Sequence, residues 1–163
     1  MDEILIDNWN LTVDENDIVF DLGDFAFAPN RRWKEILERL NGQHYLILGN
    51  HDIVRLPDNS ILNLFKQVGH QMILKINGRT VYLNHYPFLC YGGSYKNPDS
   101  TVYTLHGHLS KIENSGKDFE RMINTFPSQY DVGVDFNNYR PISWEEVRDK
   151  ISFQTVNNVN QIY

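Results

Sequence analysis

Apolar and polar residues along the chain alternate in blocks that predict strands and helices in turn. Short apolar runs at Ile18–Phe20 and Tyr45–Leu48 predict buried strands. Between these runs, apolar residues recur at helical spacing over residues 31–40, which predicts an amphipathic helix that ends at Asn41-Gly42. The same spacing predicts a second helix over residues 58–68. The first part of the chain therefore reads as alternating strands and helices.

The second half of the chain predicts strands that are joined more closely. Two runs, Met72–Ile76 and Thr80–Leu83, flank Asn77-Gly78, which is typical of a hairpin turn. Further strands are expected at Val102–Leu105 and Tyr130–Val134, and a capping-box pattern at Ser143 opens a helix to about Ile151. Together the blocks predict one α/β domain over residues 1–163, with mixed sheets covered by helices.

Composition and charge narrow the function. The net charge is -6, so the broad basic face needed for strong non-specific nucleic-acid binding is not expected. A phosphate ligand is still compatible with this charge, because a bound metal supplies positive charge locally. Cys90 is the one cysteine, so no internal disulfide can form and a cytoplasmic location is expected. No apolar run approaches the ~18 residues of a membrane span.

Metal-binding residue types follow successive predicted strands. Asp24 follows the first strand, Asn50, His51 and Asp52 follow the second, His85 follows the hairpin, and His106 and His108 flank Gly107 after the next strand. Ligand sites in α/β folds gather at the carboxyl ends of strands. Carboxylate, amide oxygen and imidazole together suit a divalent metal.

Simpler interpretations apply to each residue alone. A single histidine is more often structural than functional, and Asp or Asn beside glycine usually marks a turn. Four strand ends in succession favour a shared site over turn chemistry. The thiol of Cys90 could instead be a nucleophile activated by His85, but its apolar neighbours favour a packing role.

Four segments, in order, resemble the calcineurin-like metallophosphoesterases, in the small bacterial and phage-type branch. They are LGDFAF (22–27), GNHD (49–52), NHYP (84–87) and LHGHLS (105–110), and residues 130–147 are similar to the closing segment of that branch. The resemblance covers nearly the whole chain. It implies a four-layer α/β/β/α sandwich whose loops hold two divalent metals, commonly manganese, iron, nickel or zinc.

The resemblance also implies a role for each matching residue. Asp24 matches the carboxylate that bridges the two metals, and the remaining second-metal ligands match Asn50, His85 and His108. His51 matches the histidine beside the scissile phosphate, where it acts as general acid or stabilises charge, and Asp52 would orient it. Two metals roughly 3.5–4 Å apart clamp phosphate oxygens and lower the pKa of bound water to about 7, which yields a hydroxide nucleophile.

The chain departs from the family pattern on one side of this site. The family's Asp-x-His pair, which ends its first strand, has no match before Asp24, and Ser110 replaces the second histidine of the Gly-His-x-His motif. We therefore expect the first strand to be missing and the first-metal site to keep only Asp24. His106 is left over, as a second-shell residue, a substrate contact or a substitute ligand.

Two functions follow from this pattern. The first is a metal-dependent phosphoesterase that acts on a phosphomonoester or phosphodiester of a small molecule or nucleotide with one or two ions. Its activity is expected to be weak, because first-metal ligands are missing. The alternative is a non-catalytic or single-metal relative that acts as a binding or interaction protein. A sheet without its first strand leaves backbone groups unpaired, so self-association or docking of the tail at residues 153–156 is also expected.

Overall fold

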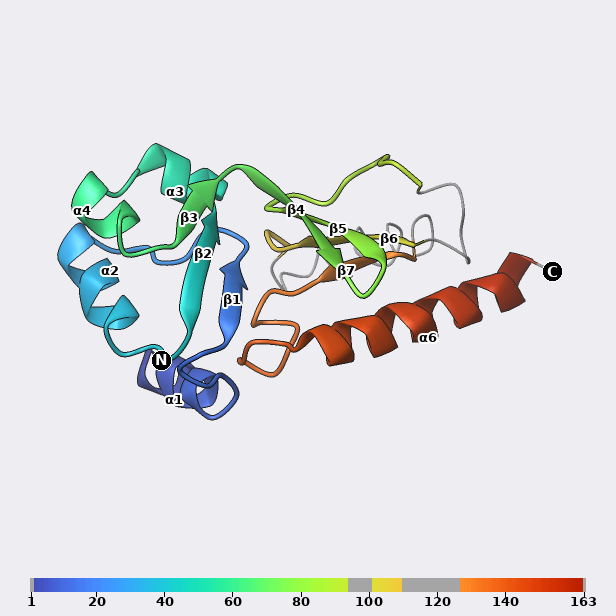
Figure 1. Cartoon of the computed structure of the whole chain (residues 1–163), viewed down its shortest axis with the longest axis horizontal. Helices are drawn as coiled ribbons and strands as arrows, with labels where there is room; N and C mark the ends of the chain where they lie inside the picture. The colour runs from blue at the N-terminus through green and yellow to red at the C-terminus, as the bar shows by residue number, and fades with distance from the viewer. Residues whose placement is uncertain (1, 94–100, 110–126, 163) are drawn as a thin grey trace.

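The computed structural model has two β-sheets flanked by helices, arranged side by side along the long axis of the molecule (Figure 1). It describes residues 2–93, 101–109 and 127–162, with the side chains described up to residue 154. The predicted mixed α/β class with two sheets is confirmed. No helix in the described residues is long and apolar enough to cross a membrane.

The first sheet is parallel, with the strand order β1-β2-β3. Its strands are β1 (Ile18–Asp21), β2 (Gln43–Ile47) and β3 (Gln67–Gly69). Helix α1 (Asp2–Asn10) precedes β1, and the connections contain α2 (Asn30–Leu37), α3 (Asn50–Val54) and α4 (Asn59–Leu62).

Alternation along β2 explains how this sheet is covered on both faces. Leu46 is fully buried in a cluster with Trp33 of α2 and Ile61 of α4. Its neighbour Ile47 is fully buried in a different cluster, with Met72 and other residues of the second sheet. Successive side chains of a strand point to opposite faces. The first sheet is therefore packed between helices on one face and the second sheet on the other.

The second sheet is mixed, with the order β4-β5-β6-β7. Strands β4 (Gln71–Ile76) and β5 (Arg79–Asn84) form the predicted antiparallel hairpin. Asn77 and Gly78 both have positive φ, 49° and 77°, as a tight hairpin turn requires. Strands β6 (Val102–His106) and β7 (Gln129–Asp131) then add in parallel.

Helix α6 (Trp144–Ile162) packs its buried Val147 and Ile151 into the core of the second sheet. Its predicted capping box is confirmed. The Ser143 hydroxyl accepts a hydrogen bond from the Glu146 backbone N–H at 3.2 Å, and the Glu146 carboxylate accepts one from the Ser143 N–H at 3.1 Å. The expected end near Ile151 is wrong, because the helix continues to Ile162.

The tail is therefore helical at residues 153–156 and does not add to a sheet edge as a strand. The Gln154 side-chain amide instead donates hydrogen bonds to the backbone oxygens of Pro127 and Gln129, at 3.0 and 2.9 Å. Docking of the tail thus takes place against β7 and not against the first sheet. Self-association stays a prediction.

The predicted helix over residues 58–68 is also wrong in its length. Helix α4 ends at Leu62, and residues 67–69 pair with β2 as β3. The Lys66 N–H donates to the His44 oxygen at 2.7 Å, which starts this pairing. The helical spacing of apolar residues gave a wrong prediction here, because Phe65 is buried although it lies beyond the end of the helix, whereas Leu64 is exposed. Strand pairing supplied hydrogen bonds that a longer helix would have supplied locally.

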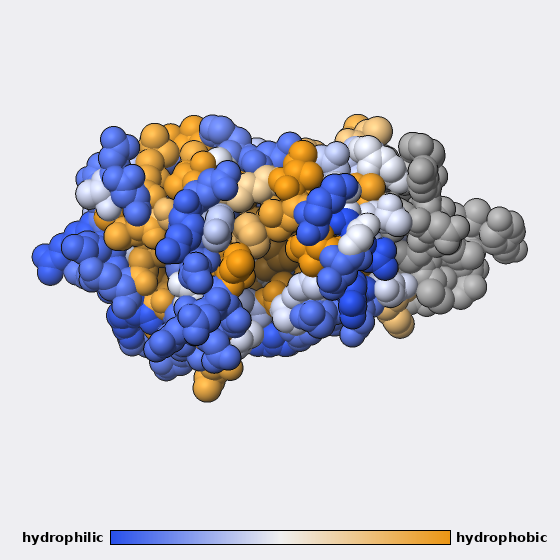
Figure 2. Space-filling view, in the orientation of Figure 1, coloured by the Kyte–Doolittle hydropathy of each residue, from blue (hydrophilic) through white to orange (hydrophobic). Residues whose placement is uncertain are grey.

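Strand β1 is an edge strand among the described residues, where it pairs with β2 alone. Beside it, a depression of ≈ 390 Å³ is lined by residues of both sheets, among them Phe20, Tyr45 and Met72. Figure 2 shows apolar surface around a hollow near the middle of the molecule, where the two halves meet. The sandwich is thus less completely filled near this edge than in its two core clusters.

The core of the second sheet offers a matched test of packing. We expect Leu83→Ala to lower the free energy of unfolding by about 2–5 kcal/mol, because this side chain is 2% exposed. Leu89→Ala is the control, since Leu89 is 85% exposed and should change stability by less than about 0.5 kcal/mol. Urea unfolding measures both, and equal losses in the two variants would contradict this packing.

Candidate metal centre

The segments that follow β1, β2, β5 and β6 bring four side chains together. They carry Asp24, Asn50 at the start of α3, His85 and His108, which the family resemblance assigns to one metal. Asp24 and His108 both have positive φ, 57° and 70°, a region that non-glycine residues seldom adopt. Such backbone strain persists where the surrounding structure enforces it, and it is common at functional sites.

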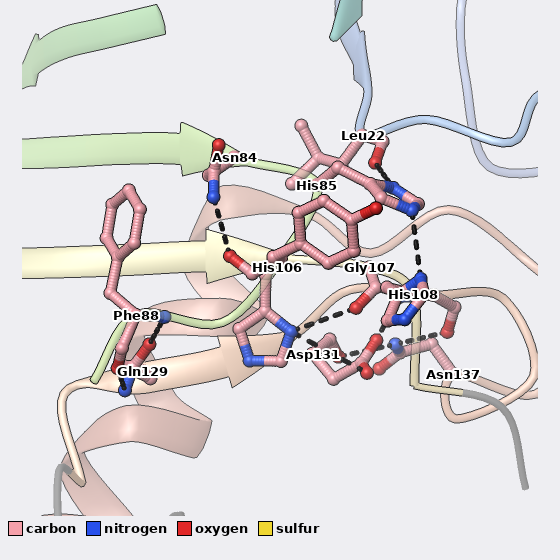
Figure 3. A network of polar contacts seen from close by, with 12 residues as sticks. Leu22, Asn84, His85, Phe88, His106, Gly107, His108, Gln129, Asp131 and Asn137 are labelled. Carbon is pink, nitrogen blue, oxygen red and sulfur yellow. Dashed lines mark hydrogen bonds and ion pairs between the residues drawn. The ribbon is translucent and has the colours of Figure 1, made fainter. Parts of the chain in front are cut away.

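His85 is the centre of this arrangement, and Figure 3 shows its ring between Leu22 and His108. Its side chain is 2% exposed, and its Nδ1 lies 2.8 Å from the backbone oxygen of Leu22. A carbonyl oxygen can only accept a hydrogen bond, so Nδ1 carries the proton. In the neutral ring, Nε2 then holds a lone pair that faces away from Leu22 and toward the other three residues.

Three side-chain atoms of the other residues surround the lone pair of His85 Nε2. It lies 2.9 Å from Asn50 Oδ1, 3.1 Å from His108 Nδ1 and 3.6 Å from Asp24 Oδ2. Two acceptors at hydrogen-bond distance repel each other unless a proton or a cation lies between them. A metal-binding histidine commonly donates its other N–H to a backbone carbonyl, as His85 does to Leu22.

The donor set fits a divalent cation. Potential ligand atoms of Asp24, His85 and His108 all lie within 4.8 Å of one another. Carboxylate and amide oxygens together with imidazole nitrogens suit manganese, iron, nickel or zinc, and the set does not discriminate among them. Their role as ligands stays a prediction, and so do the identity and number of the ions.

The charge state of His108 also suits a metal. Partial burial lowers the pKa of His108 below its usual 6.5, and the neighbouring His85 lowers it further. The carboxylate of Asp24 opposes this effect. A lower pKa favours the neutral imidazole, which is the form that binds metal.

Asp52 holds the turns that carry these ligands. Its side chain is 2% exposed, and Oδ2 accepts hydrogen bonds from the backbone N–H groups of Gly49 and Asp24, at 2.9 and 2.7 Å. Burial raises the pKa of Asp52, and these backbone donors oppose the rise. The carboxylate thus ties the turn after β1 to the turn after β2. Its predicted orientation of His51 stays a prediction.

The close packing of the turn after β1 against the turn after β2 requires a glycine at position 49. A Cβ atom at this position would lie 2.6 Å from the Asp24 backbone nitrogen and 2.8 Å from Cε1 of His85. Distances this short force the neighbouring backbone to shift. The glycine of the GNHD segment therefore has a structural reason, which is that Asp24 and His85 pack directly against it.

His51 lies at the exposed side of the group. Its backbone N–H donates to Asp24 Oδ1 at 2.9 Å, and its ring contacts Phe27 edge-on at a centroid distance of 4.7 Å. The side chain is exposed, so it is available to a ligand that reaches the centre from solvent. Its predicted role as general acid is compatible with this position and stays a prediction.

His106 points away from the centre, toward Asp131 (Figure 3). Its side chain is 0% exposed, and its Nδ1 lies 3.1 Å from the Gly107 oxygen and 3.8 Å from Asp131 Oδ2. Burial lowers the pKa of His106 to about 4 and raises the pKa of Asp131 to about 7. Contact with a substrate needs exposure that this side chain lacks, so a second-shell position fits best. Sequence reasoning missed Asp131, because only the fold brings it to His106.

Two remaining predictions concern Ser110 and Cys90. Ser110, the position where the family has a further histidine, lies outside the described residues. Across the ranges that are described, Asp24, His85 and His108 form the one such group of metal-binding side chains. Cys90 is exposed, so its interpretation as a packing residue is wrong.

Comparisons with known proteins agree with this geometry. The family described as calcineurin-like phosphoesterase matches residues 3–159. An uncharacterized protein of Methanocaldococcus jannaschii is 31% identical over 146 residues, which span 88% of this chain and 70% of that protein. A crystal structure of a protein of unknown function from Aquifex aeolicus is similar, with a TM-score of 0.63 and 22% identity over 91% of this chain and 83% of the other. The last likeness concerns the fold alone.

We expect the number of divalent ions bound per chain to be closer to one than to two. His85→Ala should abolish this binding, because it removes the ring on which the other three side chains converge. His70→Ala is the matched control, since His70 is exposed and lies outside the group. Elemental analysis after dialysis measures the content, and two tightly held ions per chain, or an unchanged content in His85→Ala, would contradict the assignment.

The buried Asp131 predicts a dependence of stability on pH. Its folded pKa of about 7 exceeds the usual 3.8, so its neutral form stabilises the fold and this contribution is lost as pH rises through about 7. Asparagine cannot ionise. We therefore expect the unfolding free energy of Asp131→Asn, relative to the wild type, to increase by on the order of 2–3 kcal/mol from about pH 5 to about pH 8.

The folded pKa of His106, about 4, lies below both pH values, so this ring stays neutral in the fold, and its titration in the unfolded chain is common to both proteins. Asp149→Asn serves as the control, because Asp149 is exposed on α6. Urea unfolding at each pH measures the difference. A difference between Asp131→Asn and wild type that is the same at both pH values would show that Asp131 ionises normally.

Proposed function

The chain belongs to the calcineurin-like phosphoesterase family, and from this we propose that it hydrolyses a phosphomonoester or phosphodiester at the centre formed by Asp24, Asn50, His85 and His108. The observation that carries the proposal is the lone pair of His85 Nε2. It faces the oxygens of Asn50 and Asp24 and the ring of His108, an arrangement that suits a cation held between them.

A divalent ion held by these four residues supplies Lewis acidity, which withdraws negative charge from a phosphate oxygen. The chain's own groups position the ester. Asp52 fixes the two turns through Gly49 and Asp24, so that the ligand-bearing loops keep their spacing without the substrate. Loops that are already fixed in position need less reorganisation when the substrate binds.

His51 is the group proposed to move a proton. It stands at the exposed side of the centre, one residue after Asn50, and its ring is packed against Phe27. From there its protonated ring would donate a proton to the leaving oxygen of the ester, as a water oxygen bonds to phosphorus and the bond from phosphorus to the leaving oxygen breaks. A general acid in this position typically contributes on the order of 10²–10⁴ in rate.

A second candidate function is a non-catalytic relative that binds one ion. It is favoured by the single metal-type group found in the described part of the chain, where the family has two metals. Such a protein would bind a phosphate-bearing partner without turnover. We further propose a small molecule or nucleotide as the ligand, manganese as a suitable ion, and the cytoplasm as the location.

Substitution of His51 separates these functions. We expect His51→Ala to lower turnover of diphenyl phosphate, with added manganese, by about 10²-fold or more, because its phenoxide leaving group needs a proton. Its metal content should not change, because this side chain serves the ester and not the ion. His70→Ala again provides a control at an exposed histidine.

Three outcomes are informative for this experiment. Equal turnover in His51→Ala and wild type rejects the assignment of His51. Loss of metal together with turnover shows that His51 acts through the ion. Full metal content with no turnover in either protein, on the diester or on p-nitrophenyl phosphate, supports the non-catalytic alternative.

A further inference from the structure

A second concave surface adjoins His51 and takes no part in the centre described above. This depression, of ≈ 430 Å³, is lined by Phe27, Ala28, Pro29, Asn30, Arg55 and Leu56. Its volume falls within the range of small-molecule sites, roughly 300–1,000 Å³. Phe27 links the two places, because its ring contacts the ring of His51 at a centroid distance of 4.7 Å.

A positively charged residue, Arg55, ends helix α3 four residues after His51. Arg55 caps the helix, and its backbone N–H donates to the His51 oxygen at 3.1 Å, which closes the last turn. Its backbone then leaves the helical conformation, with φ -126° and ψ 49°. Arg55 lines the depression together with Phe27, whose ring contacts His51, so the cation and the imidazole adjoin the same apolar residue.

Arg55 differs from the other arginines around the first sheet. Arg31, Arg32 and Arg39 all form ion pairs, with Glu35, with Asp2 and Glu35, and with Glu3. Arg55 has no ion pair with any carboxylate in residues 2–93, 101–109 and 127–162. On a chain of net charge -6, an exposed guanidinium without a carboxylate partner stands out as a place for an anion.

The far rim of the depression is fixed in place. Asn30, the first residue of α2, donates its side-chain N–H to Asp58 Oδ2 at 2.6 Å, and Asp58 caps α4 through the Ser60 N–H at 2.9 Å. The carboxylate of Asp58 is thus engaged by neutral donors and is not paired with Arg55. This hydrogen bond holds the starts of α2 and α4 together where Asn30 lines the depression.

We propose that this depression is the leaving-group subsite, and that it takes a flat unsaturated ring that carries an acidic group. The ring lies against Phe27 and Leu56, and the acidic group binds the guanidinium of Arg55. The ester oxygen between this ring and the phosphorus then faces His51. The inference rests on the proposed function, because a leaving group exists only if the chain hydrolyses an ester. The binding preference can be measured without turnover.

Two pairs of probes isolate the acidic group. Phenyl phosphate and 4-carboxyphenyl phosphate are substrates that differ by one carboxylate, and phenylphosphonate and 4-carboxyphenylphosphonate are the matching inert ligands. The full-length chain loaded with manganese should bind the carboxylated phosphonate about fivefold more tightly than the plain one. The factor is modest because an ion pair at an exposed rim is screened by water.

Variants assign this preference to its residues. Arg55→Ala should remove the fivefold factor and Arg55→Lys should keep part of it, while Arg148→Ala, a substitution on α6, should leave it unchanged. Phe27→Ala should weaken both phosphonates by a similar factor and preserve their ratio, because it removes the ring contact and not the charge. Thermal unfolding of each variant checks that the fold is retained.

The outcomes separate this inference from the proposed function. A carboxylate preference that Arg55→Ala abolishes, without turnover of either phosphate, supports the subsite and rejects hydrolysis. Turnover of both phosphates without a preference that depends on Arg55 supports hydrolysis and overturns the subsite. Binding of neither phosphonate by the wild type, or a preference that Arg55→Ala retains, also overturns the subsite.

Discussion

The candidate centre depends on the hydrogen bond between the His85 ring and the backbone oxygen of Leu22. This bond spans the two sheets, because Leu22 follows β1 and His85 follows β5. It also determines which ring nitrogen carries the proton, since the carbonyl can only accept. One contact thus joins the halves of the molecule and directs the lone pair of His85 at the other candidate ligands. The packing of Leu22 and Ile47 against Leu83 and Met72 supports it from the core side.

Asp52 and Gly49 show how the second turn meets the first. A buried carboxylate is stable when it accepts hydrogen bonds, and Asp52 accepts them from two backbone groups that have no place in a strand or helix ladder. Gly49 permits the approach by lacking a side chain. The GNHD segment therefore combines a close-packing residue, a ligand candidate, an exposed imidazole and a buried anchor in four consecutive positions.

Much of the fold was predictable because its signals are local. The Asn77-Gly78 turn and the Ser143 capping box each depend on neighbours in sequence, and both form as expected. The ligand candidates were predictable because each follows a short apolar strand. The ends of α4 and α6 were not, since pairing of β3 with β2 and the contacts of Gln154 with β7 come from distant segments. Asp131 beside His106, and Arg55 beside Phe27, likewise depend on parts of the chain that only folding brings together.

The positions of the ligand candidates along the chain have a consequence for how the protein folds. They range from residue 24 to residue 108 and come from both sheets, so every pair except those within one turn closes a long loop. Non-local contacts of this kind form late, after their loop-closure entropy has been overcome. A cation held by these residues would therefore bind only after the sheets have docked, and it would act on the end of the folding reaction by slowing the separation of the two halves. Asp24, the first of the four candidate ligands in the sequence, is therefore among the last residues to reach its native contacts.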